Sequence, residues 1–327
     1  MKLGLLLNKK IDNSLFRDLL VPITLLTTLV IYSAIFSPRL FTSGGLASAL
    51  IVTTPLILLT LSITPIALVG RGGVDLAVGP LMGFINVTLV QFLFGYGVVS
   101  PILIFAYCIL IGVAYQIIQS LIIIFVRVSP IIVSLSSYLI LSGLNLVVMP
   151  RASGVAPMWM SDWGYGTSVN SPIAYLLLIS ILLWFFISKT TFYKQIILTG
   201  SDERAAFVSG VRVNLARVGA HVLAGIFVGL GAIAFTAMIG SGDPVQGNRY
   251  TLQAVTALVL GGTSLAGGRG GGLGSIIGAL NMYLIFYVLS TFNFGLISGF
   301  VTQMFYGLIL VISLLINIFT TSIRSKE

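Results

Sequence analysis

Long apolar runs separated by short polar stretches constrain this chain more than any other feature of its sequence. A helix needs about 20 apolar residues to cross the roughly 30 Å hydrocarbon core of a bilayer. By that measure the sequence predicts ten spans and an all-α, polytopic transmembrane bundle. Their approximate limits are 19–37, 48–69, 80–98, 101–126, 130–149, 171–188, 218–240, 251–268, 274–292 and 296–319.

The composition excludes a soluble protein. Charged residues make up 8 % of the chain and hydrophobic residues 57 %, whereas an average soluble domain is roughly 25 % charged. Most of the acids lie between the apolar runs, because burying a charge in hydrocarbon costs several kcal/mol. The net charge of +9 does not indicate nucleic-acid binding, since the basic residues form no stripe with interleaved aromatics.

The placement of lysines and arginines predicts the orientation. If the N-terminus is cytoplasmic, ten spans return the C-terminus to the cytoplasm. Fourteen basic residues then lie in inner segments, and three lie in outer segments, namely Arg39, Arg151 and Arg249. This is the positive-inside bias of membrane proteins. We also expect the first apolar run to be an uncleaved membrane helix.

The sequence predicts one domain, 1–327, with two long connections between spans. The outer connection, 150–170, holds Trp159, Asp162, Trp163 and Tyr165. These aromatics suit the membrane interface, and contact with an external partner is the alternative. The inner connection, 189–217, is the most charged stretch of the chain, with five basic and two acidic residues.

A short helix is predicted within the inner connection. Its first residue would be capped by a hydroxyl, its acids would lie in the first turn where the helix dipole favours them, and a glycine would end it. The residues that carry this prediction are Ser201, Asp202, Glu203, Arg204, Ala205, Ala206 and Gly210. An ordinary amphipathic loop helix explains the spacing as well as a docking helix does.

A glycine-rich motif occurs twice. Residues 72–79 match residues 261–268 at five of eight positions. Glycine permits close backbone approach and helix breaks, which membrane proteins tolerate only against protein or a watery cavity. The pair indicates either a parallel repeat, as in some transporters, or tight packing with chance similarity. The candidate pathway residues are Gly72, Gly73, Asp75, Gly79, Gly261, Gly262, Gly267 and Gly268.

Few ionisable side chains lie near the apolar runs. Asp75 is a functional candidate by its position, although Arg71, four residues earlier, offers a neutralising partner. His221 begins an apolar run and is expected at a helix end or the membrane interface. Metal-ligand spacing is absent from the sequence. No Gly-x-x-x-x-Gly-Lys-Ser/Thr motif is present to cradle a nucleotide.

Taken together, these residues resemble the membrane permease of a bacterial ATP-binding-cassette importer of the ribose and monosaccharide family (carbohydrate uptake transporter-2). Three segments carry the resemblance: 72–79, the inner helix around 201–210, and 258–270. It extends from the second span to the last. Ala77 replaces the family's usual serine, and Gln253 replaces a usual acid, which puts any electrostatic role there in doubt.

The resemblance implies a non-catalytic transport subunit in a bacterial inner membrane. Two permeases, identical or homologous, would form the pathway, and an external binding protein would deliver the sugar. Two cytoplasmic ATPase subunits, which carry ATP and magnesium, would receive the inner helix. This chain itself would bind no cofactor. We expect a bulky charged replacement, Ala206→Glu, to uncouple ATP hydrolysis from uptake.

Three alternatives stay open: an importer of nucleosides, inositol or branched-chain amino acids, a stand-alone secondary transporter, and a membrane scaffold. The substrate is not readable from the sequence. Polar residues in the spans could contact a sugar or bond neighbouring helices, and the second is commoner. They are Asn86, Gln91, Tyr115, Gln116, Gln119, Ser134, Ser136, Ser137, Asn145 and Asn281.

Overall fold

The computed structural model describes residues 2–165, 169–292 and 298–324. Within these ranges the chain is helical and forms no β-strand. In chain order the elements are α1 (Lys2–Phe36), η1 (Pro38–Phe41), α2 (Ser43–Leu68), α3 (Val78–Thr88), η2 (Leu89–Phe94), α4 (Pro101–Leu121), η3 (Ile122–Val126), α5 (Pro130–Val148), α6 (Met158–Gly164), α7 (Pro172–Lys189), α8 (Thr191–Ser201), α9 (Glu203–Val208), α10 (Val213–Ile239), η4 (Gln246–Asn248), α11 (Arg249–Leu260), α12 (Gly272–Thr291) and α13 (Ser298–Arg324).

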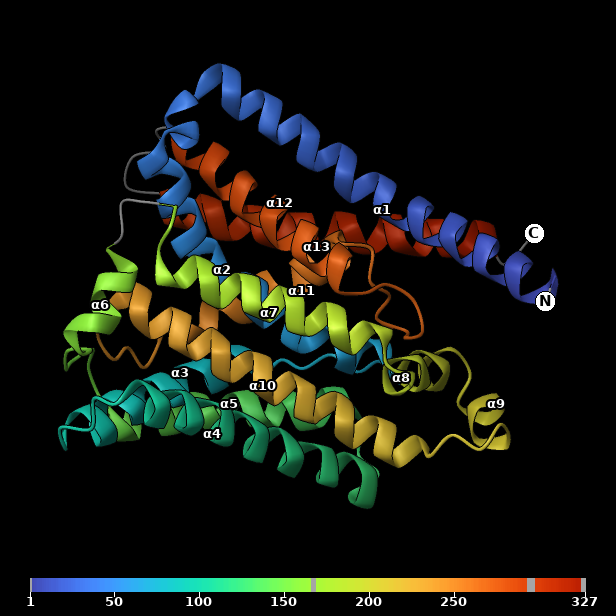
Figure 1. Ribbon diagram of the computed structural model, residues 1–327, viewed down its shortest axis with the longest axis horizontal. Helices are drawn as coiled ribbons and strands as arrows, with labels where there is room; N and C mark the ends of the chain where they lie inside the picture. The colour runs from blue at the N-terminus through green and yellow to red at the C-terminus, as the bar shows by residue number, and fades with distance from the viewer. Residues whose placement is uncertain (1, 166–168, 293–297, 325–327) are drawn as a thin grey trace.

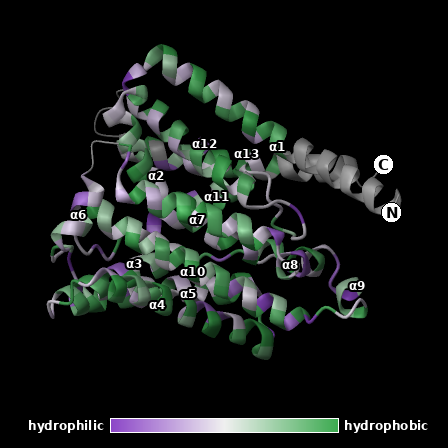
Figure 2. Cartoon of the chain, in the orientation of Figure 1, coloured by the Kyte–Doolittle hydropathy of each residue, from purple (hydrophilic) through white to green (hydrophobic). Residues whose placement is uncertain are grey.

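The long helices lie roughly side by side, and the bundle has two distinct ends (Figure 1). The start of α1 and the end of α13 lie at the end that carries α8 and α9, and α6 lies at the opposite end. We call these the α9 end and the α6 end. Hydrophilic residues gather mainly near the two ends, while hydrophobic residues cover most of the helices between them (Figure 2). This is the distribution expected of a bundle in a bilayer.

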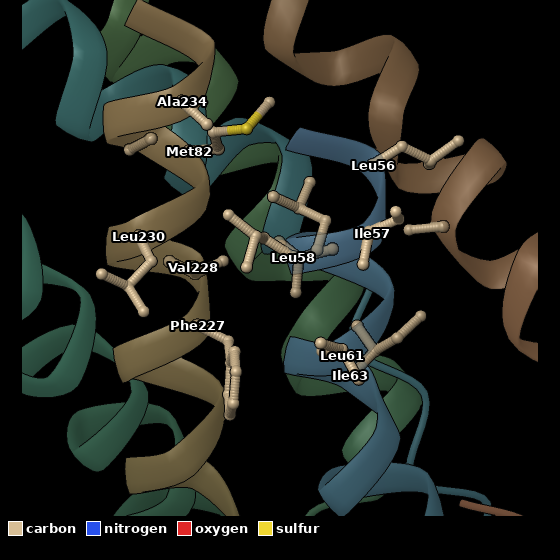
Figure 3. Packing of buried hydrophobic residues seen from close by; sticks show 14 of the residues in the cluster. Leu56, Ile57, Leu58, Leu61, Ile63, Met82, Phe227, Val228, Leu230 and Ala234 are labelled. Atoms are coloured by element: carbon tan, nitrogen blue, oxygen red, sulfur yellow. The ribbon is translucent and has the colours of Figure 1, made fainter. Parts of the chain in front are cut away.

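Helices α2 and α10 form the centre of the bundle, where Leu58 of α2 lies near Phe227 and Val228 of α10 (Figure 3). All three side chains are fully buried. Lipid is as apolar as leucine, so close packing rather than exclusion of water holds such helices together. Glycines allow that closeness between α10 and α4: a Cβ on Gly225 would lie 2.5 Å from the Val113 Cα.

The outward faces of the peripheral helices are also apolar. Large hydrophobic side chains are exposed on α4, α5 and α7, including Ile102, Val147 and Phe186. A soluble protein would not leave so much apolar surface in water. The fold is therefore an all-α, multi-pass membrane bundle.

In the described parts of the chain, seven helices are long and apolar enough to cross a membrane. They confirm seven of the ten predicted spans, and their limits are Leu19–Phe36, Ser43–Leu68, Pro101–Val126, Pro130–Val148, Pro172–Lys189, Val213–Ile239 and Gly272–Thr291. Three of them begin at a proline, whose fixed φ suits the first helical turn. The predicted tenth span falls on α13, apart from residues 296–297, which lie outside the described ranges.

Two predicted spans are shorter in the structure than the sequence suggested. The eighth, 251–268, is the 12-residue helix α11, which ends at Leu260 because Gly261 and Gly262 follow and Gly262 has a φ of 81°. The third, 80–98, is the shorter apolar helix Val78–Phe94. Apolar residues beyond these helix ends inflated the predicted lengths.

The two short helices meet at their N-termini. The Gly79 N–H donates to the Thr251 Oγ1 at 3.2 Å, and the Thr251 hydroxyl donates to the Leu76 carbonyl at 3.1 Å. A Cβ on Gly79 would lie 2.4 Å from that same Oγ1. Irregular backbone precedes each short helix: residues 69–77 lie before α3, and residues 240–245 with the single 3-10 turn η4 lie before α11.

Candidate functional site

The predicted short helix is present at the α9 end, but a different residue caps it. The Asp202 carboxylate accepts hydrogen bonds from the Arg204 and Ala205 N–H groups at 2.9 and 3.0 Å. Ser201, the predicted cap, is instead the last residue of α8, and its hydroxyl donates to the Ile197 carbonyl. Both residues are good caps, and the end of the preceding helix decides between them.

Helix α9 presents an apolar, outward-facing edge. Phe207 is 72 % exposed and Val208 is 86 % exposed, whereas Ala206 is buried. Gly210 follows with a φ of 84°, which fits its predicted role in ending the helix. The Ala206→Glu substitution is therefore a poor test of docking, because a buried glutamate would disrupt the local fold. The exposed residues are the ones able to touch a partner.

An ion-pair cluster holds α9 against the bundle. Arg71 contacts both oxygens of the Glu203 carboxylate, Nε to Oε2 at 2.8 Å and Nη2 to Oε1 at 2.9 Å. Arg217, in the first turns of α10, places its Nη2 2.8 Å from the same Oε2. A two-pronged arginine–carboxylate contact fixes geometry as well as charge. Glu203 therefore links α9 to the loop after α2 and to α10.

The same cluster sets the ionisation of Glu203. Partial burial disfavours the charged carboxylate, but the hydrogen bonds from Arg71 and the charge of Arg217 outweigh it and lower the pKa of Glu203 below its usual 4.5. The carboxylate therefore stays charged at neutral pH. Beside the cluster lies a hollow of about 1060 Å³, whose lining includes Arg71, Glu203, Phe207 and Val208.

Glycines bring three backbone segments into contact just behind α9. A Cβ on Gly200 would lie 1.8 Å from the Leu68 carbonyl oxygen, and one on Gly267 would lie 2.5 Å from the Gly70 Cα. The Gly268 N–H donates to the Leu68 carbonyl at 3.0 Å. We call this contact the glycine junction. It joins the ends of α2 and α8 to the loop after α11.

The remaining motif glycines have other partners. Gly73 packs against the Ile66 carbonyl, and Gly261 packs against the Gly274 carbonyl of α12. Gly72 has a φ of 66° and an open side, where a Cβ would meet only Ile131 at 3.9 Å. Gly79 reaches α11, as described above. The first motif leads into a short helix and the second follows one, so the two copies do not have the matching surroundings that the parallel-repeat interpretation expects.

Asp75 does not pair with Arg71, contrary to expectation. It is 1 % exposed and accepts hydrogen bonds from the Ala77 N–H and from the side-chain amides of Gln116 and Gln119. Gln116 also contacts His221 Nδ1 at 2.7 Å. His221 is therefore buried within α10 rather than placed at a helix end or interface. Arg71 contacts Glu203 instead, and its backbone is left-handed, with a φ of 58°.

Several polar residues considered as sugar ligands bond their neighbours instead. Asn86 donates to Thr236 and Ser241 and accepts from the Asp243 N–H. Further bonds between separate elements are made by Ser134 to Val74, Asn145 to Pro80 and Asn281 to Pro22. These contacts agree with the commoner role of intramembrane polar groups.

Two residues of the α9-end site were missed from the sequence. Arg217 was counted only as one charge of the inner connection, and Arg71 was assigned to Asp75. Glu203 is 132 residues from Arg71 along the chain, so no local spacing could have revealed that pair. The high charge of 189–217 was the one available signal.

The bundle and its charged α9 end define a multi-pass membrane transport protein. The chain belongs to the family described as branched-chain amino acid transport system, permease component, whose profile matches residues 45–314. It is 30 % identical over 255 residues to a ribose import permease of Bacillus subtilis, covering 75 % of this chain and 76 % of the relative.

Two further relatives match different lengths of this chain. A ribose import permease of Escherichia coli K12 is 29 % identical over 79 % of this chain and 81 % of its own length. A galactose/methyl galactoside import permease of the same strain is 32 % identical over 57 % of this chain and 56 % of its own length. No solved structure matches the chain.

Proposed function

We propose that this chain is the permease subunit of an ATP-binding-cassette importer that carries a monosaccharide across a bacterial inner membrane. The observation that carries the proposal is the way α9 is attached: an exposed apolar edge, fixed to the bundle through Glu203, Arg71 and Arg217. The relatives named for ribose, galactose and fructose import support the substrate class.

The attachment of α9 to the bundle suits a helix that transmits movement of a bound partner to the permease. A partner that pushes on Phe207 and Val208 displaces Glu203, which pulls on the end of α2 through Arg71 and on α10 through Arg217. The glycine junction adds α8 and the loop after α11 to the same rigid contact. Since α2 and α10 form the centre of the bundle, movement at α9 reaches the whole permease as a rigid-body shift.

We infer ten membrane crossings with both termini in the cytoplasm at the α9 end. Seven crossings are the long helices, α13 is an eighth, and each short helix with its non-helical continuation completes one more. The whole of 1–327 then forms one domain, with 189–217 facing the ATPase and 150–170 facing an external binding protein. A second permease, identical or homologous, completes the pathway.

In this proposal the chain performs no chemistry. ATP and magnesium are bound by the ATPase subunits, and no cofactor is held by the permease. Its contribution is mechanical: it converts closure of the ATPase pair into a change of access to the solute path.

The test is association with the ATPase. Val208→Glu places a charge on the most exposed apolar position of α9 without entering the fold, and we expect it to abolish co-purification of the ATPase subunit with the tagged permease. The matched control is Val155→Glu, because Val155 is an equally exposed valine, at 77 %, near the α6 end. It should retain the ATPase. Retention by both variants, or solute uptake by the permease alone without ATP, contradicts the proposal.

A further inference from the structure

A second polar cavity lies away from the α9 end, among α5, α11, α12 and α13. Its volume is about 760 Å³, within the range of small-molecule sites. The polar side chains that line it include Tyr138, Asn248, Arg249, Gln253, Gln303 and Tyr306. Five of these six come from α11, from the residue before it, and from α13, so the short helix is a principal wall of the cavity.

The cavity is open at the surface where α12 ends and α13 begins, and its other wall reaches the start of α11. The Asn145 amide of α5 donates to the Pro80 carbonyl near the start of α3. Pro130, the first residue of α5, lies beside Arg71 and Arg217 at the α9 end. Asn145 follows it by 15 helical residues, so it is roughly 22 Å from that end along α5. The start of α11 adjoins the start of α3 through Thr251 and Gly79. Arg249, the first residue of α11, therefore lies in the half of the bundle nearer the α6 end.

The charge of the cavity is positive. Arg249 makes no ion pair with any side chain that the structure describes, and none of the described lining residues is acidic. Asp243, the nearest acid along the chain, is engaged elsewhere, because its carboxylate accepts from the Val245 and Gln246 N–H groups, both at 2.9 Å. The N-terminus of α11 adds a further partial positive charge. A cation that lines such a cavity marks a candidate site for an anionic solute.

The other lining groups suit a hydroxylated ring. Gln253 of α11 and Tyr306 of α13 both line the cavity and present an amide and a phenol to it. The Asn248 Oδ1 is buried and has no protein partner, so it is free to accept a hydrogen bond from a solute. Tyr138 and Tyr306 offer aromatic faces, and amides and phenols together can satisfy several hydroxyl groups.

We propose that this cavity is the solute site of the permease and that it takes a monosaccharide bearing a carboxylate, held by Arg249 at the N-terminus of α11. The inference rests on the proposed function and narrows its substrate class. A neutral sugar would satisfy the amides and phenols but leave Arg249 unpaired in the cavity. A sugar acid satisfies both sets of groups.

The experiment measures dissociation constants of the full chain in lipid nanodiscs for three matched pairs of probes. The pairs are D-galacturonate and D-galactose, D-glucuronate and D-glucose, and D-ribonate and D-ribose, with acetate at the same ionic strength as a control for charge alone. We expect at least one acid to bind about tenfold more tightly than its neutral partner, the ratio that one charge-assisted hydrogen bond supplies.

Variants assign the preference to the cavity. Arg249→Gln should bring the acid and its neutral partner within about twofold of each other, while the control Arg151→Gln, near the α6 end, keeps the tenfold ratio. Three results overturn the proposal: no pair prefers the acid, acetate binds as well as the sugar acids, or Arg249→Gln retains the preference. Association with the ATPase is measured separately with Val208→Glu, so a wrong substrate class is distinguishable from a wrong function.

Discussion

Glu203 shows how one side chain can carry a mechanical connection. It is the only residue of α9 for which the structure gives ion pairs to two other parts of the described bundle. An exposed ion pair contributes little to stability, commonly below about 1 kcal/mol. The importance of this cluster therefore lies in the geometry it fixes, since Arg71 from the loop after α2 and Arg217 from α10 both contact the same carboxylate of α9.

The lowered pKa of Glu203 gives the attachment a predictable pH dependence. A carboxylate whose folded-state pKa is depressed stabilises the folded state fully above its ordinary pKa of 4.5 and loses that contribution as pH falls through the lower value. We expect the protection of α9 from hydrogen exchange, corrected for the intrinsic rate, to be constant from pH 5 to 8 and to decrease below 4.5.

Glu203→Gln should remove that dependence and lower the protection at neutral pH to the level that the wild type reaches at low pH, because the amide carries no charge for the two arginines. Asp202→Asn is a suitable comparison, since an asparagine can still cap the helix and Asp202 makes no ion pair with a described side chain. Protection that declines already between pH 7 and 5 in the wild type would contradict the assigned role of Glu203.

At the scale of elements, the glycine junction has no room for a side chain. Gly200→Ala would put a methyl group 1.8 Å from the Leu68 carbonyl oxygen, and backbone rather than a flexible side chain would have to move. Overpacking of this kind typically costs about 1–3 kcal/mol. We expect a clear decrease in the thermal unfolding midpoint in detergent, together with weaker ATPase association, because the end of α8 shifts relative to α2.

Gly44→Ala provides the control. Gly44 lies in the first turn of α2, and a Cβ there would meet nothing within 4 Å. Alanine also favours a helix by up to about 1 kcal/mol over glycine, so this variant should be neutral or slightly stabilising. Equal effects of the two substitutions would show that the junction does not need glycine.

The sequence predicts the limits of some helices better than those of others. A helix such as α10 is predicted by its uninterrupted apolar run, and seven spans could be predicted in this way. Helix α11 could not, because apolar residues continue past its last turn and only the backbone shows that Gly261 and Gly262 end it. The cap of α9 was missed by one residue. The contacts of Glu203, Asp75 and His221 depend on tertiary packing between distant segments and have no local signature.

At the scale of the whole molecule, the decisive question is whether a short helix with a non-helical continuation completes a crossing. Seven long helices alone would place the ends of the chain on opposite sides. Ten crossings place both ends with α9. Irregular backbone is tolerated at membrane depth where protein buries it or where it lines a cavity, and residues 69–77 and 240–248 are bonded to α5, α3 and α11.

Single cysteines and a membrane-impermeant maleimide distinguish the two topologies in intact cells. The native Cys108 is buried and should give little background. With ten crossings, Tyr96→Cys, after the first short helix, reacts from outside, as does Val155→Cys. Ser209→Cys reacts only after permeabilisation. If the first short helix did not complete a crossing, the three crossings that follow would place Tyr96→Cys and Val155→Cys inside and Ser209→Cys outside, so only Ser209→Cys would react in intact cells.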